Sequence, residues 1–410
     1  MYNENEIKEI TCIILEMFVK TYDLSCMNNL LENDNITSKD WIFNNKKYKI
    51  LKYNKSKINE DTFNTTAPFR SVIMSNNNIL SFSPEKSRSD NYFLSFYKEH
   101  ECIAEEFVEG TMINLFYDKE MSKWEIATKT SVGANIRFFK DQKNFNKLFN
   151  EVCSYLNIDI NNFDENYNYS FVMQHPENRF VIPITEMRLY LIAVYKIDND
   201  SKKVIEIPKI EYQNLNLPQT LSYPYGHYFD TYSNLLTNYA SLNTSTTIMG
   251  VIVKHENGDR TKFRNPNYEH VKKLRGNNCK LQFQYLTLHK ENKVNEYLHY
   301  YPENRKLFND YKKNLFNFTN VLFNNYVECY IKKMYPLKEY PFQYRNHMFA
   351  LHELYLKIKM ENKIINFQEV IKYVKSLDPA RLMFSLNYHL RDLSNPIDLQ
   401  KNNEATMEIN

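Results

Sequence analysis

Residues 104–113 read Ala-Glu-Glu-Phe-Val-Glu-Gly-Thr-Met-Ile. Gly110 is one of only six glycines in 410 residues, and glycine serves where the backbone needs a conformation that other residues avoid. Apolar residues continue on both sides of this position, and a second apolar segment follows Asp118-Lys119-Glu120. We therefore predict a β-hairpin made of residues 102–117 and 123–132.

The stretch resembles the nucleotidyl-lysine motif of bacteriophage-type RNA ligases, which reads Lys-x-Asp-Gly-Ser and precedes an apolar strand. Glu109, Gly110 and Thr111 stand at the Asp, Gly and Ser positions, and Phe107 stands where the lysine is expected. In this enzyme class the lysine amine attacks the α-phosphate of ATP. A phenylalanine ring has no such nucleophile. The resemblance thus implies a ligase-type fold without ordinary ligase chemistry, and it leaves the catalytic residues unknown.

Further segments resemble other motifs of the family, and they follow one another in the expected order over roughly residues 65–275. In the family they contribute a nucleotide-contacting arginine, a Pro-x-x-Lys segment, a second hairpin strand, a Pro-x-Asn-Arg signature and two late strands. Here they read Phe69-Arg70-Ser71-Val72-Ile73, Ser83-Pro84-Glu85-Lys86, Trp124-Glu125-Ile126-Ala127-Thr128-Lys129-Thr130-Ser131, His175-Pro176-Glu177-Asn178-Arg179-Phe180-Val181, Met249-Gly250-Val251-Ile252-Val253 and Thr261-Lys262-Phe263-Arg264. The chain also resembles a divergent ligase-like group of large DNA viruses in which the motif lysine is replaced.

Two carboxylates of the family pattern are missing as well. No acidic residue stands near Val172, and Met249 replaces the glutamate that opens a late strand. Divalent metal ions need oxygen ligands, so we predict no metal site. What survives is mostly basic, and the resemblance assigns nucleotide or phosphate binding to Arg70, Glu109, Gly110, Lys129, Arg179, Lys262 and Arg264. Cations of this kind suit phosphate groups.

Three functions stay open. The first is a catalytically degenerate, RNA-ligase-like protein that binds RNA or a nucleotide through a basic cleft. The second is an active nucleotidyltransferase that uses ATP and Mg²⁺ and a relocated lysine, either Lys129 or Lys86, because cationic neighbours lower the pKa of a lysine. The third is a viral structural or scaffold protein. Glu109 is either part of the site or a structural carboxylate, and His175 is either structural or catalytic.

The segment from residue 254 to 280 favours nucleic acid as the partner. It holds eight Lys and Arg residues against three Asp and Glu, and Phe263 and Tyr268 lie among them. Cations interleaved with aromatic rings are typical of surfaces that bind single-stranded nucleic acid. A solvated helix face has the same composition, and the ligase resemblance favours the RNA interpretation.

The whole-chain composition sets broader limits. The net charge of +3 decides nothing about partners, and no apolar run approaches the length of a membrane span. The N-terminus lacks the layout of a signal peptide, and six scattered cysteines without a Cys-x-x-Cys pair indicate free thiols in a reducing, intracellular compartment.

Periodicity predicts an α+β fold, with an antiparallel-sheet nucleotidyltransferase domain of the ligase type followed by a helical domain. We expect a helical N-terminal extension over residues 1–60, the ligase-like domain over 61–275 and the helical domain over 276–410, which could also contact a protein partner. Within the ligase-like domain, strands are predicted at 168–173, 179–184, 189–196, 247–254 and 260–264, and a helix at 141–157.

Overall fold

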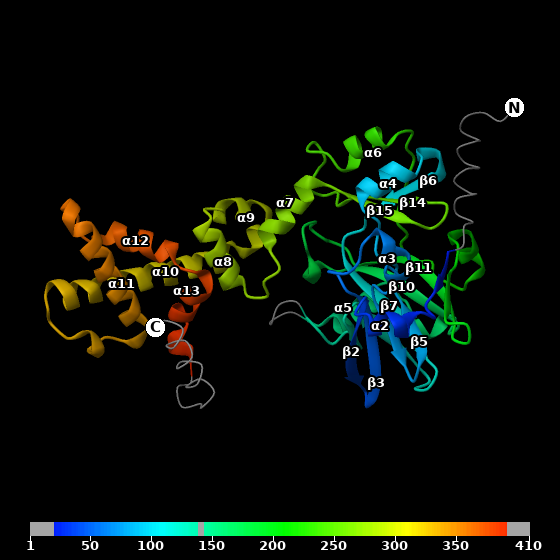
Figure 1. The fold of residues 1–410 in the computed structure, drawn as a ribbon, viewed down its shortest axis with the longest axis horizontal. Helices are drawn as coiled ribbons and strands as arrows, with labels where there is room; N and C mark the ends of the chain where they lie inside the picture. Colours follow the sequence, from blue (N-terminus) through cyan, green and yellow to red (C-terminus); the bar gives the residue numbers. More distant parts are fainter. Residues whose placement is uncertain (1–19, 138–142, 392–410) are drawn as a thin grey trace. The chain divides into compact units, whose positions relative to one another are not determined.

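A computed structural model describes residues 20–137 and 143–391 (Figure 1). The chain divides into two compact units, residues 1–273 and 274–410. The first contains the β-sheets and the second is helical. The expected fold class, α+β with antiparallel sheets followed by a helical part, is confirmed.

The largest sheet described in the first unit has seven strands, each antiparallel to its neighbours. In spatial order they are β1 (Thr21–Asp23), β12 (Lys203–Glu206), β11 (Arg188–Asp198), β10 (Tyr167–Gln174), β7 (Thr111–Asp118), β8 (Lys123–Thr128) and β9 (Ser131–Val132). One face packs on helix α5 (Phe145–Tyr155) through a buried core that includes Ile113, Leu115, Phe171 and Leu148.

A second sheet covers the opposite face of the largest one. Its four described strands are β2 (Ile36–Phe43), β3 (Lys46–Tyr53), β4 (Val72–Ser75) and β5 (Asn78–Phe82). Tyr48 and Ile50 of β3 pack with Phe116 of β7 and Ala127 of β8. Helices α2 (Met27–Glu32) and α3 (Glu60–Thr66) precede β2 and β4 respectively.

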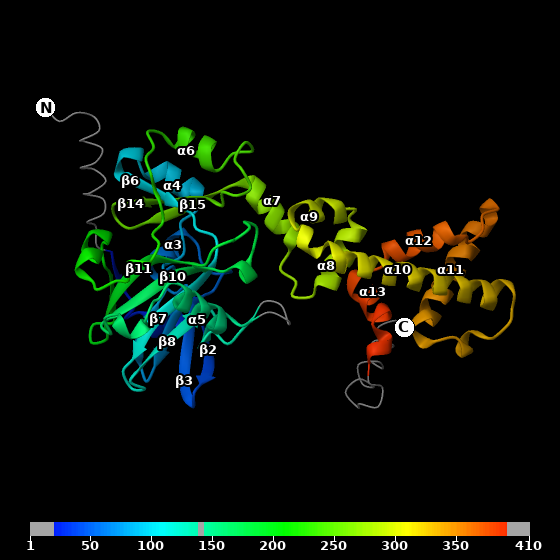
Figure 2. The same ribbon diagram turned by 180° about the vertical axis from the view of Figure 1, so that it is seen from behind.

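The third sheet holds the late strands of the ligase-like pattern. Its described strands, in order, are β13 (Gly226–His227), β6 (Cys102–Glu106), β14 (Gly250–His255) and β15 (Arg260–Arg264). Helices α4 (Asp90–Phe96) and α6 (Tyr232–Tyr239) lie on one side of it in both views (Figure 1, Figure 2). Val251, Val253 and Phe263 point to these helices and form a buried core with Phe93 and Leu235.

The second unit is built from helices alone in its described part. They are α8 (Leu281–Lys290), α9 (Val294–Tyr300), α10 (Arg305–Tyr326), α11 (Phe342–Ile358), α12 (Phe367–Ser376) and α13 (Pro379–Leu386), and α7 (Pro266–Arg275) contains the boundary between the units. None of the described helices combines the length and apolar composition that crossing a bilayer requires.

The structure differs from three local expectations. Where we expected a helical extension over residues 1–60, residues 36–53 form the strands β2 and β3, and residues 1–19 lie outside the described part. The apolar run over 102–117 is two strands, β6 and β7, which belong to different sheets. The third difference is residues 179–184, which form no strand.

Candidate functional site

One face of strand β15 carries a row of cations. In the sheet, Lys262 lies opposite Ile252 of β14, which lies opposite Glu105 of β6. Since side chains alternate along a strand, Arg260 and Arg264 share the face of Lys262, whereas Phe263 points to the helix-covered core. The pattern Arg-x-Lys-x-Arg therefore places three cations on the face of this sheet that α4 and α6 leave uncovered.

Phe107 lies next to this row. It follows the last residue of β6 and is half-buried. The Nζ atom of Lys262 lies 4.9 Å from the centre of the Phe107 ring, and the guanidinium carbon of Arg264 lies 5.6 Å from it. Both distances are within the range of cation–π contacts. An amine thus lies beside the position where the motif lysine is expected, although it comes from another strand.

Lys262 is held in an environment that disfavours its charge. Burial lowers the pKa of its amine to about 6, and the nearby charges of Arg260, Arg70, Arg264 and Lys129 act in the same direction. A lysine with this pKa is largely neutral at pH 7, which ordinary lysines are not.

Arg70 and Lys129 complete the group. Arg70 follows α3, donates from Nη1 to the carbonyl oxygen of Pro84 at 3.3 Å, and has a pKa lowered to about 10 by burial and by Arg260. The amine of Lys129 lies 5.5 Å from the ring centre of Tyr53. Burial and the charge of Arg70 lower its pKa to about 8. We refer to Arg70, Lys129, Arg260, Lys262 and Arg264 as the cationic cluster.

Arg260 was not among the residues selected from the sequence. Its side chain is buried, and Nη2 donates to the carbonyl oxygen of Glu85. Its Nε–H group has no hydrogen-bond partner among the described residues. The strand alternation that links it to Lys262 and Arg264 was visible in the sequence and could have identified it.

Nearby carboxylates pair with cations other than Lys262 and Lys129. Glu105 is buried between Lys209, at 2.7 Å, and Lys254, at 3.2 Å. Although burial opposes ionisation, these two lysines lower its pKa to about 2. Glu85 pairs with Lys20, and Arg264 pairs with Glu269 at 2.7 Å. Among the described residues, no carboxylate forms an ion pair with Lys262 or Lys129.

The Glu-Gly-Thr turn serves a different purpose from the one that the resemblance implies. The buried carboxylate of Glu109 accepts hydrogen bonds from the backbone N–H groups of Phe180, Val181 and Ile182 at 3.1–3.3 Å. Thr111 accepts from the side chain of Asn178 at 2.7 Å. The turn therefore fastens the 178–182 segment, and because the amides of 180–182 point to Glu109, that segment cannot continue as a strand.

Two of the predicted phosphate-binding or catalytic cations make other contacts. The Lys86 amine lies 5.1 Å from the ring centre of Phe63, and its pKa is lowered by burial. Arg179 donates from Nε to the carbonyl oxygen of Val181 at 3.1 Å. Lys262 and Arg264 therefore contact Phe107, and Arg70 and Lys129 lie close enough to Lys262 for their charges to act on it. Lys86 and Arg179 contact other groups.

The residues present do not fit the divalent metal ion of the ligase family. Val172, where a carboxylate is expected, packs in an apolar cluster with Val108 and Tyr190. Glu109 uses its oxygens for backbone amides, and Met249 offers no oxygen ligand. A hard cation would find no free carboxylate at these three positions.

A separate group of possible metal ligands consists of Glu151, His175 and Glu177. The amine of Lys143 already bridges the two carboxylates, at 2.9 and 2.7 Å. His175 Nδ1 accepts from the backbone N–H of Glu177 at 3.1 Å, so the proton of the neutral ring is on Nε2, which faces Glu151 at 3.1 Å. Neither ring nitrogen has a free lone pair for a metal ion, and His175 is therefore structural in this arrangement.

The sequence matches no protein-family model. It is 23% identical over 306 residues to a protein described as an immediate-early protein ICP-46 homolog of Invertebrate iridescent virus 3, and the match covers 71% of this chain. The chain spans 64% of the length of that relative.

Solved structures similar to this chain include RNA ligases. An archaeal ATP-dependent RNA ligase matches in two forms, with TM-scores of 0.35 and 0.38 and identities of 12% and 11%; each match covers 64% of this chain, and they cover 64% and 65% of the ligase. A mutant RNA ligase of Naegleria gruberi, determined with ATP and Mn, has a TM-score of 0.34 and 10% identity over 62% of this chain and 84% of its own. Since all three scores lie below 0.5, the function must be inferred from the residues of the site.

Proposed function

We propose that this RNA-ligase-like protein binds the phosphate groups of RNA or of a nucleotide such as ATP through the cationic cluster, without using position 107 for chemistry. The observation that supports this most directly is the cluster itself. Lys262 is half-buried among four other cations, and no acidic residue pairs with it in the described part of the chain.

Such an arrangement is unfavourable in the unliganded protein. Burying cations side by side without a counter-charge reduces stability, because each loses hydration and repels the next. A phosphate group would relieve both effects and would give the unpartnered Nε–H of Arg260 an acceptor. The negative charge of the phosphate would also raise the pKa of Lys262. Phosphate binding near pH 7 would therefore be accompanied by protonation of the Lys262 amine.

The test is RNA affinity across a salt series. For single-stranded nucleic acid, each phosphate contact contributes about −0.7 to the slope of log K against log salt. We expect Lys262→Ala/Arg264→Ala to weaken binding by about tenfold or more at low salt and to make the slope shallower by roughly 1.4. Lys119→Ala/Lys196→Ala is the matched control, since it removes two exposed cations away from the cluster. Binding that is absent, or equal in both double variants, would favour a scaffold role instead.

A second candidate function is favoured by the position of Lys262. Its amine lies beside the expected nucleophile position and has a pKa of about 6, so a neutral, nucleophilic amine is available at pH 7. In this alternative the amine nitrogen forms a bond to the α-phosphorus of ATP, the bond from phosphorus to pyrophosphate breaks, and the amine loses a proton. Lys129, with a pKa of about 8, is a further candidate.

Intact mass after incubation with ATP and either Mg²⁺ or Mn²⁺ separates the two functions. The binding proposal expects no mass gain. A gain of one AMP that disappears in Lys262→Ala or in Lys129→Ala, and persists in Lys119→Ala, would establish nucleotidyl transfer through a relocated lysine. Lys86→Ala belongs in the same series, because the sequence also pointed to that residue.

A further inference from the structure

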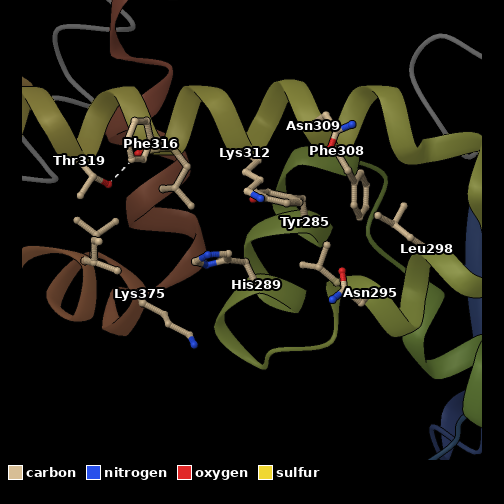
Figure 3. A pocket seen from close by; sticks show the side chains of 14 residues that line it. Tyr285, His289, Asn295, Leu298, Phe308, Asn309, Lys312, Phe316, Thr319 and Lys375 are labelled. Carbon is tan, nitrogen blue, oxygen red and sulfur yellow. Dashed lines mark hydrogen bonds between the residues drawn. The ribbon is translucent and has the colours of Figure 1, made fainter. Parts of the chain in front are cut away.

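The helical unit contains a cavity of about 410 Å³. It is lined by one face each of α8, α9, α10 and α12, and Lys312, Tyr285 and His289 lie in its middle (Figure 3). In this view Phe316 and Thr319 lie toward one end, and Leu298 and Asn295 toward the other. The volume is within the range of about 300–1,000 Å³ that is usual for small-molecule sites.

The buried part of the lining is carbon surface. Phe308 and Leu315 of α10, Val374 of α12 and Tyr285 of α8 are buried, with at most 6% of each residue exposed. The hydroxyl of Thr319 donates its proton to the carbonyl oxygen of Leu315 at 2.8 Å. An apolar ligand would therefore remove its own surface and that of these walls from water without leaving the hydroxyl of Thr319 unpaired.

The charged groups of the lining are all basic. The lining contains Lys312, Lys375 and His289, and none of its residues is an Asp or Glu. Burial lowers the pKa of His289, and the charges of Lys375 and Lys312 lower it further. The two lysines therefore lie close enough to His289 to interact with it electrostatically. Lys312 is exposed and Lys375 is half-buried beside Asn292, to which it donates. The cavity thus has an apolar floor of buried side chains, and its two lysines belong to the more exposed part of the lining.

We propose that this cavity binds a small amphipathic anion, an acyl or alkyl chain with a carboxylate or phosphate head, whose chain packs on Phe308, Leu315 and Val374 and whose head pairs with Lys312 and Lys375. A nucleotide also has an anionic group, but the hydrogen-bonding edge of its base would meet the carbon floor unpaired, which is unfavourable. The site belongs to the helical unit, and the proposal does not depend on the function of the cationic cluster.

Calorimetric titration of the full chain with dodecanoate and with dodecyl phosphate, below their micelle-forming concentrations, tests the proposal and compares the two heads. We expect saturable binding of one molecule that is weakened about tenfold in Lys312→Ala/Lys375→Ala. Lys313→Ala/Lys372→Ala is the matched control, because these exposed lysines are on the same two helices but do not line the cavity. The control should bind like the parent.

Leu298→Trp, at the half-buried end of the cavity, should reduce the affinity by filling the chain site without removing a charge. Far-UV circular dichroism shows whether this variant is folded, and the two lysine pairs test the proposal even if it is not. Three results would overturn the inference: no saturable binding, equal binding of dodecyltrimethylammonium, or tighter binding of AMP than of either dodecyl anion at this site. The last would assign the cavity to nucleotides.

Discussion

The amine of Lys262 lies 4.9 Å from the centre of the Phe107 ring, so a lysine from β15 lies beside the position at which the ligase motif has its own lysine. The ring cannot react, but its face attracts a cation by about 0.5–2 kcal/mol. When Lys262 is protonated, Phe107 therefore offsets a small part of the repulsion from its four cationic neighbours.

Phe107→Lys should not create a ligase site. The new amine would lie beside Lys262, with which no carboxylate pairs among the described residues, and no carboxylate at positions 172 or 249 would hold a metal ion. We expect no AMP adduct by intact mass and a loss of stability of about 1–3 kcal/mol in denaturant unfolding.

Phe107→Leu is the comparison for this variant. It removes the aromatic face without adding charge, and it should be less destabilising than Phe107→Lys. If Phe107→Lys formed an AMP adduct, the interpretation of a degenerate site would be wrong.

Lys262→Met should stabilise the protein while it weakens phosphate binding. The side chain keeps its length but loses the charge that is repelled by Arg260, Arg70 and the rest of the cluster. Thermal unfolding at pH 6 should shift upward by roughly 2–4 °C for each kcal/mol gained in a unit of this size.

The pH dependence of this effect has a definite sign. The pKa of Lys262 is about 6 in the folded chain and about 10.4 in an unfolded one. Between these values the unfolded chain holds more protons, so the parent gains stability as the pH rises. The advantage of Lys262→Met should be complete below about pH 6 and smaller at pH 9. An advantage that grows with pH would contradict the lowered pKa.

Glu109→Gln should destabilise the first unit by about 2 kcal/mol or more, since hydrogen bonds to a charged group contribute about 1.5–3 kcal/mol. The amide would turn an N–H donor toward the N–H groups of Val181 or Ile182. Urea unfolding provides the measurement.

Glu106→Gln is the control for Glu109→Gln. Its half-buried carboxylate accepts from the backbone of Tyr225 at 3.4 Å, and its substitution should change stability by less than about 0.5 kcal/mol. Equal effects in the two variants would mean that Glu109 does not fasten the 180–182 segment.

Local patterns predicted strands well where burial decides the structure. The strand predicted at residues 260–264 is β15, and the structure adds that Lys262 lies on the face that the helices leave uncovered. Residues 179–184 are more apolar than residues 260–264, yet they form no strand, because three of their N–H groups are taken by a carboxylate more than 70 residues earlier in the chain. Periodicity within a short window contains no information about such a contact.

Only part of the candidate site could be predicted, because contacts between residues far apart in the chain are not contained in a local sequence pattern. Basic residues could be selected from their motif positions, but the sequence could not tell which of them lie together. Glu109 shows the limit most clearly: its motif position suggested a phosphate site, and the structure uses it as an acceptor for backbone amides. Arg260 was not selected from the sequence, yet it belongs to the cationic cluster because it shares a strand face with Lys262.

Gly110 offers a test of the turn itself. Its φ is +154°, and a Cβ atom there would lie 2.5 Å from the carbonyl oxygen of Met173 and 2.7 Å from a methyl group of Val172. Backbone atoms of β10 cannot move aside without breaking the sheet, so Gly110→Ala should destabilise the first unit by about 1–3 kcal/mol or more. Gly226→Ala is the control, because nothing lies within 4 Å of its added Cβ, and it should stay within about 0.5 kcal/mol of the parent. Urea unfolding of the two variants side by side makes the comparison. Equal stabilities would mean that the Glu-Gly-Thr turn is not held against β10, and the structural role assigned to this turn would have to be abandoned.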